Sequence, residues 1–444
     1  MTSTSRPLTA VILAAGLGTR MKSRLPKALH RLANRPMINH LIDTVQQVAD
    51  DIVVVVGPDM PALEKAAHPH RSVVQTERLG TGHAARTAEP FFGEGDVIIL
   101  NADNPLISSE TLHNLLSARK NGAALAMLGM RPKDPARYGR VVEANGNVQR
   151  IVEYKDATDE ERGIGLCNAG AFCASAQDLR VWLSQIDNKN AQNEYYLTDV
   201  VALAAQSRTV QCVVADEAEL AGVNSRAELA QVEHSIQQRL RAAAMANGAT
   251  LVAPETVFFS ADTVIETDVT IEPNVFFGPG VTVRSDSIIR AFSHLENCTI
   301  GEAVSIGPYA RIRPGTICEK GSHVGNFVEL KNVTLGAGAK ANHLTYLGDA
   351  SIGAATNIGA GTITCNYDGV FKHRTTIGAN GFIGSNAILV APVNIGDEAL
   401  IAAGSVITAN VSDGAMAFGR ARQTEKTERG RETMTALRKK KEQG

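Results

Sequence analysis

The sequence predicts a Rossmann-like α/β domain with a mostly parallel sheet, followed by a parallel β-helix built from hexapeptide repeats. Three observations lead to this prediction. The chain has 444 residues, which is longer than a domain built around a single hydrophobic core usually is. Its first half alternates short apolar runs with amphipathic stretches. Its second half instead repeats an aliphatic residue at every sixth position.

Short apolar runs in the first half have the length and composition of buried parallel strands. They lie at residues 9–13, 52–56 and 97–100, and an amphipathic stretch at 40–48 has helical spacing. This alternation is typical of a doubly wound α/β domain, which we place at residues 1–225. Ligands of such folds bind beyond the carboxyl ends of the strands.

A helix is expected to link the two domains, over residues 226–249. Ser225 and Glu228 have the spacing of a capping box, and Gly248 stands where the helix would end. One apolar stripe runs along the predicted helix, formed by Leu229, Val232, Ile236, Leu240 and Ala243.

The β-helix is predicted over residues 250–424 from its period of six. The period is kept by Val269, Val275, Val281, Ile300, Ile306, Ile312, Cys318, Val324, Leu330, Ile377, Ile383, Leu389, Ile395, Ile401 and Ile407. Such a recurrence is neither helical nor an ordinary strand alternation, and it is the signature of hexapeptide β-helices. A glycine-rich sandwich, the alternative, would not keep register for so long. Residues 425–444 are polar and basic, and we expect a frayed, solvated tail.

Composition excludes several classes of protein. Hydrophobic content of 44% and charged content of 20% fit a soluble globular chain, and a net charge of -2 lacks the positive excess that nucleic-acid binding needs. The six cysteines form no CxxC pair, which indicates reduced thiols and a cytoplasmic location. No apolar stretch is long enough to span a membrane.

A glycine-rich run follows the first predicted strand. Residues 13–21 read LAAGLGTRM, and Lys27 comes soon after. Gly16 and Gly18 allow backbone N–H groups to approach an anion closely, and Arg20 and Lys27 supply positive charge for a triphosphate. Neither the Walker A pattern nor the dinucleotide fingerprint fits, so the run alone predicts only a phosphate-binding loop.

With Pro26-Lys27 downstream, this run resembles the sugar-1-phosphate nucleotidyltransferases. The resemblance implies Mg²⁺ held by Asp103 and Asn224, and attack of an anionic sugar phosphate on the α-phosphorus of UTP without a protein base. It also implies nucleotide and sugar contacts by Leu13, Ala14, Ala15, Gly16, Arg20, Lys27, Gln75, Gly80, Thr81, Asn101, Asp103, Gly139, Glu153, Asn168 and Asn224. The chain departs from the family in one place: it has Asn101-Ala102-Asp103 where Tyr-Gly-Asp is usual.

Several of these residues also have a simpler interpretation. Asp103 would close a turn, Asn224 would only cap the following helix, and Glu153 would form a surface ion pair with Lys155. Two histidines outside the motifs, His83 and His373, are interpreted as surface or packing residues.

Three runs break the hexapeptide register, at residues 311–315, 343–349 and 357–369. Breaks in a solenoid usually mark loops that leave the coil on a binding face. These runs match the acetyltransferase half of the bifunctional N-acetylglucosamine-1-phosphate uridyltransferases/glucosamine-1-phosphate acetyltransferases, and the resemblance covers nearly the whole chain. It implies a left-handed β-helix, acetylation of glucosamine-1-phosphate by acetyl-CoA before uridylyl transfer from UTP, and a homotrimer.

His343 is the general base that this resemblance implies. The attacking amine must lose a proton, and an imidazole is suited to accept it. Asp349, in the same run, is a candidate to orient the imidazole. The resemblance further implies sugar-phosphate contacts by Arg313, Lys331, Tyr346, Asn357 and Lys372. Acetyl-CoA contacts are implied for Ala360, Asn366, Tyr367, Ser385, Ala403 and Arg420.

Two other functions compete with the bifunctional enzyme. A plain nucleotidyltransferase with a regulatory β-helix, as in ADP-glucose and GDP-mannose pyrophosphorylases, would lack the HLTY and CNYDG runs present at 343–346 and 365–369. A trimeric scaffold with inactive domains would not need Arg20, Lys27, Asp103 and Asn224, which are all present.

Overall fold

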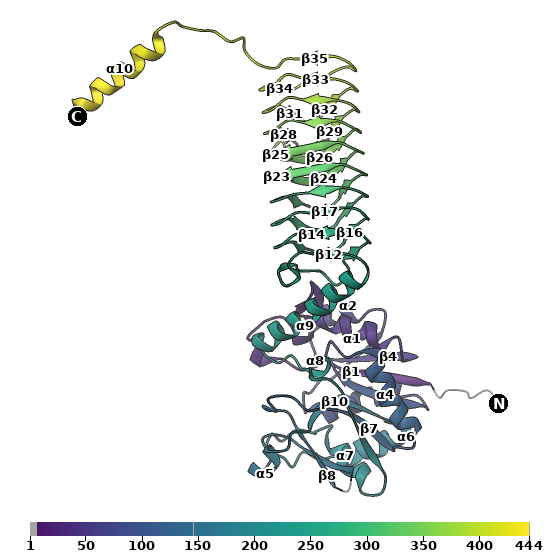
Figure 1. The fold of residues 1–444 in the computed structure, drawn as a ribbon. Helices are drawn as coiled ribbons and strands as arrows, with labels where there is room; N and C mark the ends of the chain where they lie inside the picture. The colour runs from purple at the N-terminus through teal and green to yellow at the C-terminus, as the bar shows by residue number, and fades with distance from the viewer. Residues whose placement is uncertain (1–6, 145, 444) are drawn as a thin grey trace, which may run out of the picture. The chain divides into compact units, whose positions relative to one another are not determined.

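The computed structural model describes residues 7–144 and 146–443 and divides into two compact units, Met1–Ala242 and Ala243–Gly444 (Figure 1). The division lies inside the long helix α9 (Arg226–Ala246). The first six residues of the predicted α/β domain and the last residue of the predicted tail lie outside the described residues.

The first unit contains one mixed sheet. Strands β1 (Leu8–Leu13), β4 (Asp51–Val56), β5 (Arg71–Val74) and β6 (Asp96–Asn101) are parallel neighbours, and β7 (Leu125–Met130) pairs in parallel with β11 (Val210–Val214). Between them, β10 (Cys167–Ser175) is antiparallel to both β6 and β7. A hairpin of β8 (Arg140–Ala144) and β9 (Asn147–Val152) extends from β10, and β2 (Arg31–Leu32) pairs separately with β3 (Arg35–Pro36). The three predicted strands are present, each longer by one or two residues.

Helices cover both faces of this sheet because side chains alternate along its central strands. Ile12 and Val54 face α1 (Met37–Val45), α2 (Pro61–Ala67) and α4 (Ser109–Lys120). Val11 and Val53 face α3 (Thr81–Ala88), α6 (Ala176–Gln185) and α7 (Asp199–Ala205). Short helices complete the unit: η1 (Thr19–Met21), η2 (Lys27–Leu29), η3 (Glu89–Phe91), α5 (Asp159–Arg162) and α8 (Glu217–Leu220). The helix predicted at 40–48 begins and ends earlier, as α1, because it starts directly after Pro36.

Helix α9 differs from its prediction in two details. The Ser225 hydroxyl accepts from the Glu228 N–H as expected, but the Glu228 carboxylate returns to the N–H of Asn224 instead of Ser225. The buried face is Val232, Ile236, Gln237 and Arg241, while Ala243 at the end of the predicted stripe is exposed. Gly248 does follow the helix end, with a φ of 95° that an L side chain rarely adopts.

The second unit is a β-helix whose short strands stack in parallel from coil to coil (Figure 1). A short helix, η4 (Pro254–Thr256), lies in the first coil. One sheet consists of β12 (Thr250–Leu251), β14 (Thr270–Ile271), β17 (Ile288–Ile289), β20 (Ser305–Ile306), β23 (His323–Asn326), β25 (Lys340–His343), β27 (Asn357–Ile358), β30 (Phe382–Ile383), β33 (Leu400–Ile401) and β35 (Met416–Ala417). The other contains β13 (Val264–Ile265), β15 (Phe276–Phe277), β16 (Val281–Val283), β18 (His294–Leu295), β19 (Cys298–Ile300), β21 (Arg311–Ile312), β22 (Thr316–Cys318), β24 (Glu329–Leu335), β26 (Tyr346–Ile352), β28 (Ile363–Cys365), β29 (Thr375–Ile377), β31 (Ile388–Val390), β32 (Val393–Ile395) and β34 (Val406–Ile407). Every residue that set the period of six is buried inside the coil. With the hexapeptide pattern, this architecture is that of a left-handed parallel β-helix.

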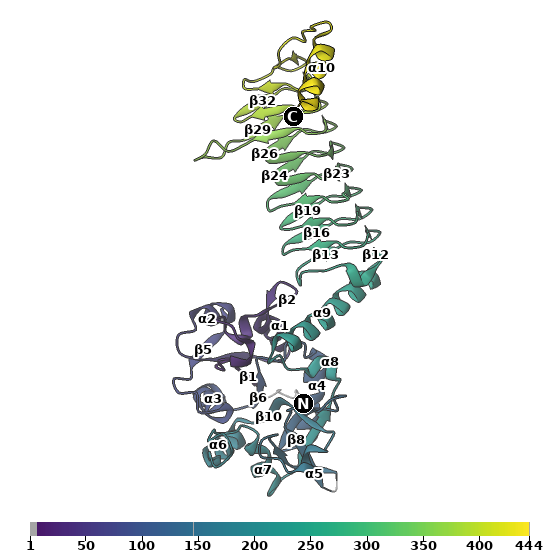
Figure 2. The same ribbon diagram turned by 90° about the vertical axis from the view of Figure 1, so that its left-hand side faces the viewer.

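Two of the three register breaks stay within the coil, contrary to the prediction. Residues 311–315 and 343–349 lie in or between paired strands. The period of six is interrupted because the coils from Leu295 to Ile312 and from Leu330 to Leu347 are each one residue shorter than the coil before it. The third break does leave the coil: residues 366–373, between β28 and β29, project outward (Figure 2). We call this segment the projecting loop. It is closed by a bridge between Tyr367 and Lys372.

The predicted frayed tail is wrong in one respect. Residues Arg429–Glu442 form a helix, α10, although all of it is exposed, as expected of a solvated segment. Nowhere in the described part of the chain is there a helix with the length and apolar character to cross a membrane.

Candidate active sites

The glycine-rich run after β1 packs against Lys27. Gly18 has a φ of 61°, and a Cβ built on it would lie 2.7 Å from the Lys27 Cβ. Only glycine meets both conditions without strain, so this position fixes the approach of the loop to the lysine. The close packing of Gly18 against Lys27 therefore holds the lysine beside the glycine-rich run that follows β1.

Lys27, Asp103 and Asn224 converge although they are far apart in the chain. The Lys27 ammonium lies 2.6 Å from Asp103 Oδ2 and donates to Asn224 Oδ1 at 3.0 Å. Two oxygens thus converge on one cation, with the lysine and aspartate side chains only 19% and 17% exposed. Asn224 is not the helix cap, because it turns its side chain to Lys27 while Ser225 caps the helix. Asp103 lies in the turn after β6, as its simpler interpretation expects, and also contacts Lys27.

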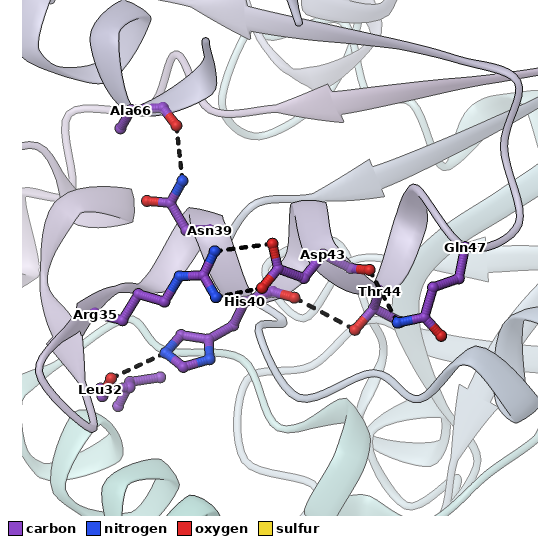
Figure 3. A network of polar contacts seen from close by, with 8 residues as sticks. All are labelled: Leu32, Arg35, Asn39, His40, Asp43, Thr44, Gln47 and Ala66. Carbon is purple, nitrogen blue, oxygen red and sulfur yellow. Dashed lines mark hydrogen bonds and ion pairs between the residues drawn. The ribbon is translucent and has the colours of Figure 1, made fainter. Parts of the chain in front are cut away.

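The segment that carries Lys27 is anchored beyond the lysine by α1 (Figure 3). Arg35, on β3, forms an ion pair with Asp43, with its Nη2 donating to Oδ1 at 2.8 Å. His40 Nε2 lies 2.9 Å from the carbonyl oxygen of Leu32. Burial lowers the pKa of His40, which favours the neutral imidazole that donates this bond. Asn39 extends the network to α2 by donating to the Ala66 carbonyl at 2.7 Å.

Two neighbouring cavities open at the carboxyl ends of the strands. The larger, of about 440 Å³, is lined by Leu13, Ala14, Ala15, Gly16, Leu17, Lys27, Ala28, Gln75, Arg78, Gly80, Thr81, Ala84, Asn101, Ala102, Asp103 and Glu194. The smaller, of about 190 Å³, is lined by Asn101, Asp103, Asn104, Arg137, Tyr138, Gly139, Glu153, Asn168, Ala169, Gly170, Gly222 and Asn224. Asn101 and Asp103 belong to both, so the oxygen pair lies where the cavities meet. Of the residues predicted for this half, Arg20 alone lines neither cavity; it is exposed on η1.

Glu153 is a half-buried carboxyl in the smaller cavity and not one partner of a surface ion pair. Thr198 Oγ1 donates to its Oε1 at 3.2 Å, whereas Lys155 bonds Gln192. Burial raises the pKa of Glu153 against the opposing effect of the Thr198 hydrogen bond. Gly139 lies against it, since an added Cβ there would be 3.4 Å from Oε1.

Sequence reasoning missed Arg78, which lines the larger cavity, and it missed that His83 contacts Gln75 of the same cavity. Arg78 lines it and donates from Nε to the Ala15 carbonyl at 2.8 Å, so the guanidinium is held at the glycine-rich loop. His83, interpreted as a surface or packing residue, contacts Gln75: the Gln75 Nε2 lies 3.1 Å from both His83 Nδ1 and the Gly80 carbonyl. The signal for Arg78 was its place directly before Leu79-Gly80-Thr81; His83 carried none.

In the second unit, His343 begins a column of small residues that runs along one corner of the coil. The N–H of Gly361 bonds the His343 carbonyl at 3.2 Å, that of Asn386 bonds Ala360 at 2.7 Å, and that of Gly404 bonds Ser385 at 2.8 Å. His343, Ala360 and Ser385 are therefore stacked coil upon coil, with Ala403 next and Arg420 near Gly404. This is a narrow strip without bulky side chains that ends at an exposed imidazole.

The partner of His343 is not the one expected. Its Nδ1 lies 2.8 Å from Asn326 Oδ1, in the coil below, so Asn326 orients the ring. Asp349 instead contacts Asn332, Asn366 and Lys331. The sequence could not distinguish these, because Asn326 belongs to a different repeat.

Cationic groups gather on the strands after the same corner. Arg313 donates to Glu329 at 2.8 Å, Lys331 lies 3.7 Å from Asp349, and Lys372 lies 5.3 Å from the centre of the Tyr367 ring. The neighbouring Lys331 lowers the pKa of Lys372, because two like charges at this place disfavour the protonated form. Tyr346 pairs in register with Glu329, and Asn357 lies one coil above Lys340 in the sheet that contains His343.

The same corner carries large exposed side chains in the coils below His343. Phe292, Tyr309 and Phe327, which we call the aromatic ridge, stack with ring centroids 4.9 and 5.1 Å apart. They are 51%, 48% and 55% exposed, and Leu344 continues the line at 64%. All have φ between 52° and 61°, a region where bulky residues are uncommon and strained.

Comparison with known proteins finds a matching family for each half of the chain. The MobA-like NTP transferase domain family matches residues 10–151, and the hexapeptide repeat of succinyl-transferase matches residues 374–409. The bifunctional protein GlmU of Gluconobacter oxydans is 68% identical over 444 residues, which are 100% of both chains. The GlmU proteins of Gluconacetobacter diazotrophicus and Acidiphilium cryptum are 63% and 59% identical, over 99% and 96% of this chain and 96% and 98% of theirs.

Proposed function

The chain belongs to the family of the bifunctional protein GlmU, and on this basis we propose how its residues carry out the two activities. It is a bifunctional transferase: it acetylates the amine of glucosamine-1-phosphate from acetyl-CoA, and it then transfers uridylyl from UTP to N-acetylglucosamine-1-phosphate, releasing pyrophosphate. The HLTY and CNYDG runs and the full-length match to bifunctional relatives support this function over a plain nucleotidyltransferase or an inactive scaffold.

For uridylyl transfer, the proposal rests on the convergence of Asp103 Oδ2 and Asn224 Oδ1 on the Lys27 ammonium. A carboxylate and an amide oxygen that already share one cation suit a divalent metal, which we propose is Mg²⁺. When bound, Mg²⁺ would neutralise charge on the phosphates during in-line displacement. Lys27 is then free to contact phosphate oxygens, together with the N–H groups of the glycine-rich loop and, in our proposal, Arg20 and the newly found Arg78.

The two cavities suit the two substrates of this half. In the larger, the Gln75 amide nitrogen is occupied by Gly80 and His83, which leaves its oxygen to accept from the N3–H of uracil. Leu13 to Gly16, Gly80, Thr81 and Asn101 form the rest of the nucleotide site. In the smaller, Gly139, Glu153 and Asn168 would hold the sugar, so its phosphate lies at the shared Asp103 wall. The sugar phosphate is itself an anionic nucleophile, so positioning and charge neutralisation are the work of the protein.

For acetyl transfer, we propose His343 as the general base, oriented by Asn326. Nδ1 donates its hydrogen bond to Asn326 Oδ1, so the other ring nitrogen, Nε2, is the atom that accepts the proton from the attacking amine. Arg313, Lys331, Tyr346, Asn357 and Lys372 would hold the sugar phosphate. Acetyl-CoA would lie along the column of Ala360, Ser385 and Ala403, with Asn366, Tyr367 and Arg420 at its sides. We base the acetyl-CoA assignment on this column, because it is an extended strip of small residues that ends at the proposed base.

We propose that the active molecule is a homotrimer in the cytoplasm. His343 is exposed in a single chain, and the aromatic ridge lies in the coils directly below it. Strained, exposed aromatic side chains are stabilised by burial against another protein surface, and a second copy seated there would also enclose the base. A cytoplasmic location agrees with free cysteines in the described residues and with the supply of UTP and acetyl-CoA.

A pair of variants tests the division of labour. Asp103→Ala should abolish uridylyl transfer and leave acetyl transfer intact, whereas His343→Ala should lower acetyl kcat by about 10²–10⁴-fold and leave uridylyl transfer intact. The sugar-phosphate KM should change less than kcat in the His343 variant, since its anchors remain. Both half-reactions are measured on each purified protein. Full Mg²⁺-dependent uridylyl transfer by Asp103→Ala, or acetyl kcat near the wild-type value in His343→Ala, would refute the corresponding assignment.

A further inference from the structure

Asp349 has no part in the chemistry just proposed, yet its carboxylate is shared by several polar groups. Asn332 Nδ2 donates to Oδ1 at 2.8 Å. Asn366 Nδ2 donates to Oδ2, and Lys331 Nζ lies 3.7 Å from the same oxygen. The Asp349 side chain is 14% exposed, and that of Lys331 is 23% exposed. One oxygen atom therefore contacts both a residue proposed for the sugar phosphate and a residue proposed for acetyl-CoA.

The charges around Asp349 show why this carboxylate matters. Arg313 has its own counter-charge in Glu329, but Lys331 and Lys372 repel each other. Asp349 is the anion beside that pair. Burial raises the pKa of Asp349, but the hydrogen bonds from Asn332 and Asn366 and the charges of both lysines outweigh it and hold the pKa below its ordinary value. The group is ionised at neutral pH and keeps two ammonium groups together at the place where a phosphate would bind.

We propose that Asp349 is a positioning residue that ties together the two substrate sites of acetyl transfer. It holds the Lys331 ammonium for the sugar phosphate and the Asn366 amide for acetyl-CoA against one carboxylate. The proposal rests on the assignment of Lys331 and Asn366 to these substrates. It goes beyond that assignment because it makes the binding of both substrates depend on a residue that touches neither.

A specific kinetic pattern follows. His343 is held separately by Asn326, so loss of the Asp349 charge should leave the base in place. Asp349→Asn should therefore raise KM for glucosamine-1-phosphate and for acetyl-CoA by about 10-fold each, the usual consequence of losing a charged hydrogen-bond partner, and change kcat by less than about 3-fold. A residue that only stabilised the coil would lower the amount of active enzyme, and so kcat, instead.

Double-mutant cycles test whether Asp349 acts through the two named residues. In a Lys331→Met background, Asp349→Asn should no longer change KM for the sugar phosphate. In an Asn366→Ala background, it should no longer change KM for acetyl-CoA. Asp268→Asn is the matched control, since Asp268 also occupies a corner with positive φ (59°) but lies several coils away. It should leave both constants unchanged.

A second variant keeps the test valid if Asp349→Asn destabilises the coil, as thermal unfolding would reveal. Asp349→Glu retains the charge, and the chain already accepts glutamate in a corner at Glu398, with a φ of 54°. This variant should bind the sugar phosphate within about 3-fold of the wild type but lose affinity for acetyl-CoA, because the longer side chain displaces the Asn366 hydrogen bond. Unchanged KM values in Asp349→Asn, or effects that persist fully in both backgrounds, would overturn the proposal.

Uridylyl transfer, measured on every variant, reports that the other half is folded. Failure of the wild-type protein to acetylate glucosamine-1-phosphate would contradict the proposed roles of Lys331 and Asn366 themselves. A wild-type enzyme that acetylates normally, combined with an indifferent Asp349→Asn, would contradict only the role given to Asp349.

Discussion

At the scale of single residues, both sites depend on charged groups held in unfavourable surroundings. Glu153 is the clearest case, because burial raises the pKa of its carboxyl group and, among the residues that the structure describes, the Thr198 hydroxyl is the group that supports the charge. An ionised carboxylate in this position lowers the stability of the fold. A ligand that donates hydrogen bonds to the carboxylate would offset this cost, which supports a binding role for Glu153. Asp103 avoids the same cost by lying beside Lys27.

Glu153→Gln should stabilise the first unit at neutral pH and weaken uridylyl transfer. A raised carboxyl pKa means that the folded chain binds this proton more tightly than the unfolded chain, so the stability it contributes is present at acid pH and is lost as pH rises through the folded pKa. The variant should therefore melt at a higher temperature than the wild type near pH 8, and the difference should vanish near about pH 4. Thermal unfolding at both pH values checks this, with the exposed Glu160→Gln as control. Equal melting temperatures near pH 8 would contradict it.

At the scale of elements, α9 is a structural part of the uridylyl site as well as a connection between units. Arg226 donates from Nε to the Met21 carbonyl at 3.3 Å and lies at the same distance from His30 Nδ1, so it contacts both ends of the segment that carries Lys27. The Glu233 carboxylate accepts from the Ala33 N–H at 2.8 Å. Helix α9 therefore positions both residues: Glu228 in its first turn holds Asn224, and Arg226 and Glu233 hold the segment that carries Lys27.

Arg226→Ala should raise KM for UTP by about 3- to 10-fold, because these hydrogen bonds hold Lys27 at the phosphate site. Acetyl transfer should be unchanged. Steady-state kinetics of both half-reactions measure the effect, and Gln238→Ala, at an exposed position of the same helix, is the control. An unaltered UTP constant in Arg226→Ala would mean that Lys27 is held adequately by α1 and the hairpin of β2 and β3.

At the scale of the whole molecule, the corners of the β-helix have unlike compositions. Most corner residues with positive φ are glycine, asparagine or aspartate, which tolerate that region, or the small residue alanine, but the corner below His343 carries the aromatic ridge and Leu344. Large apolar side chains at strained, exposed positions indicate a contact surface. We assign this surface to the proposed trimer.

The double variant Tyr309→Asp/Phe327→Asp should dissociate the trimer, because a buried charge is costly at an apolar contact. Acetyl transfer should fall with it, while uridylyl transfer persists. Light scattering combined with both activity assays gives the answer. Ile317→Asp is the control, since Ile317 is 46% exposed on a different strand, β22. An intact trimer in the double variant, or dissociation by Ile317→Asp alone, would show that the contact lies elsewhere.

The sequence by itself determined the features that are encoded locally. The buried strands of the α/β unit, the hexapeptide ladder and the glycine-rich loop each follow from spacing within a few residues, and the structure agrees with them. Lys27 was predicted from the charge that a phosphate loop needs, whereas Asp103 and Asn224 were predicted through a resemblance, each with a plausible structural alternative. The tail helix and the two register breaks that stay in the coil were mispredicted, because a polar stretch and a coil shortened by one residue both look locally like loops.

Only the tertiary structure decided which residues meet. Lys27 and Asn224 are 197 positions apart, and their hydrogen bond depends on how α9 returns to the loop after β1. In the coil, each turn brings a residue above one from the previous repeat, so Asn326 and not Asp349 became the partner of His343. Asp349 was left to join Lys331 to Asn366. Pairings of this kind are set by the rise and register of the whole chain, and no local pattern of residue types encodes them.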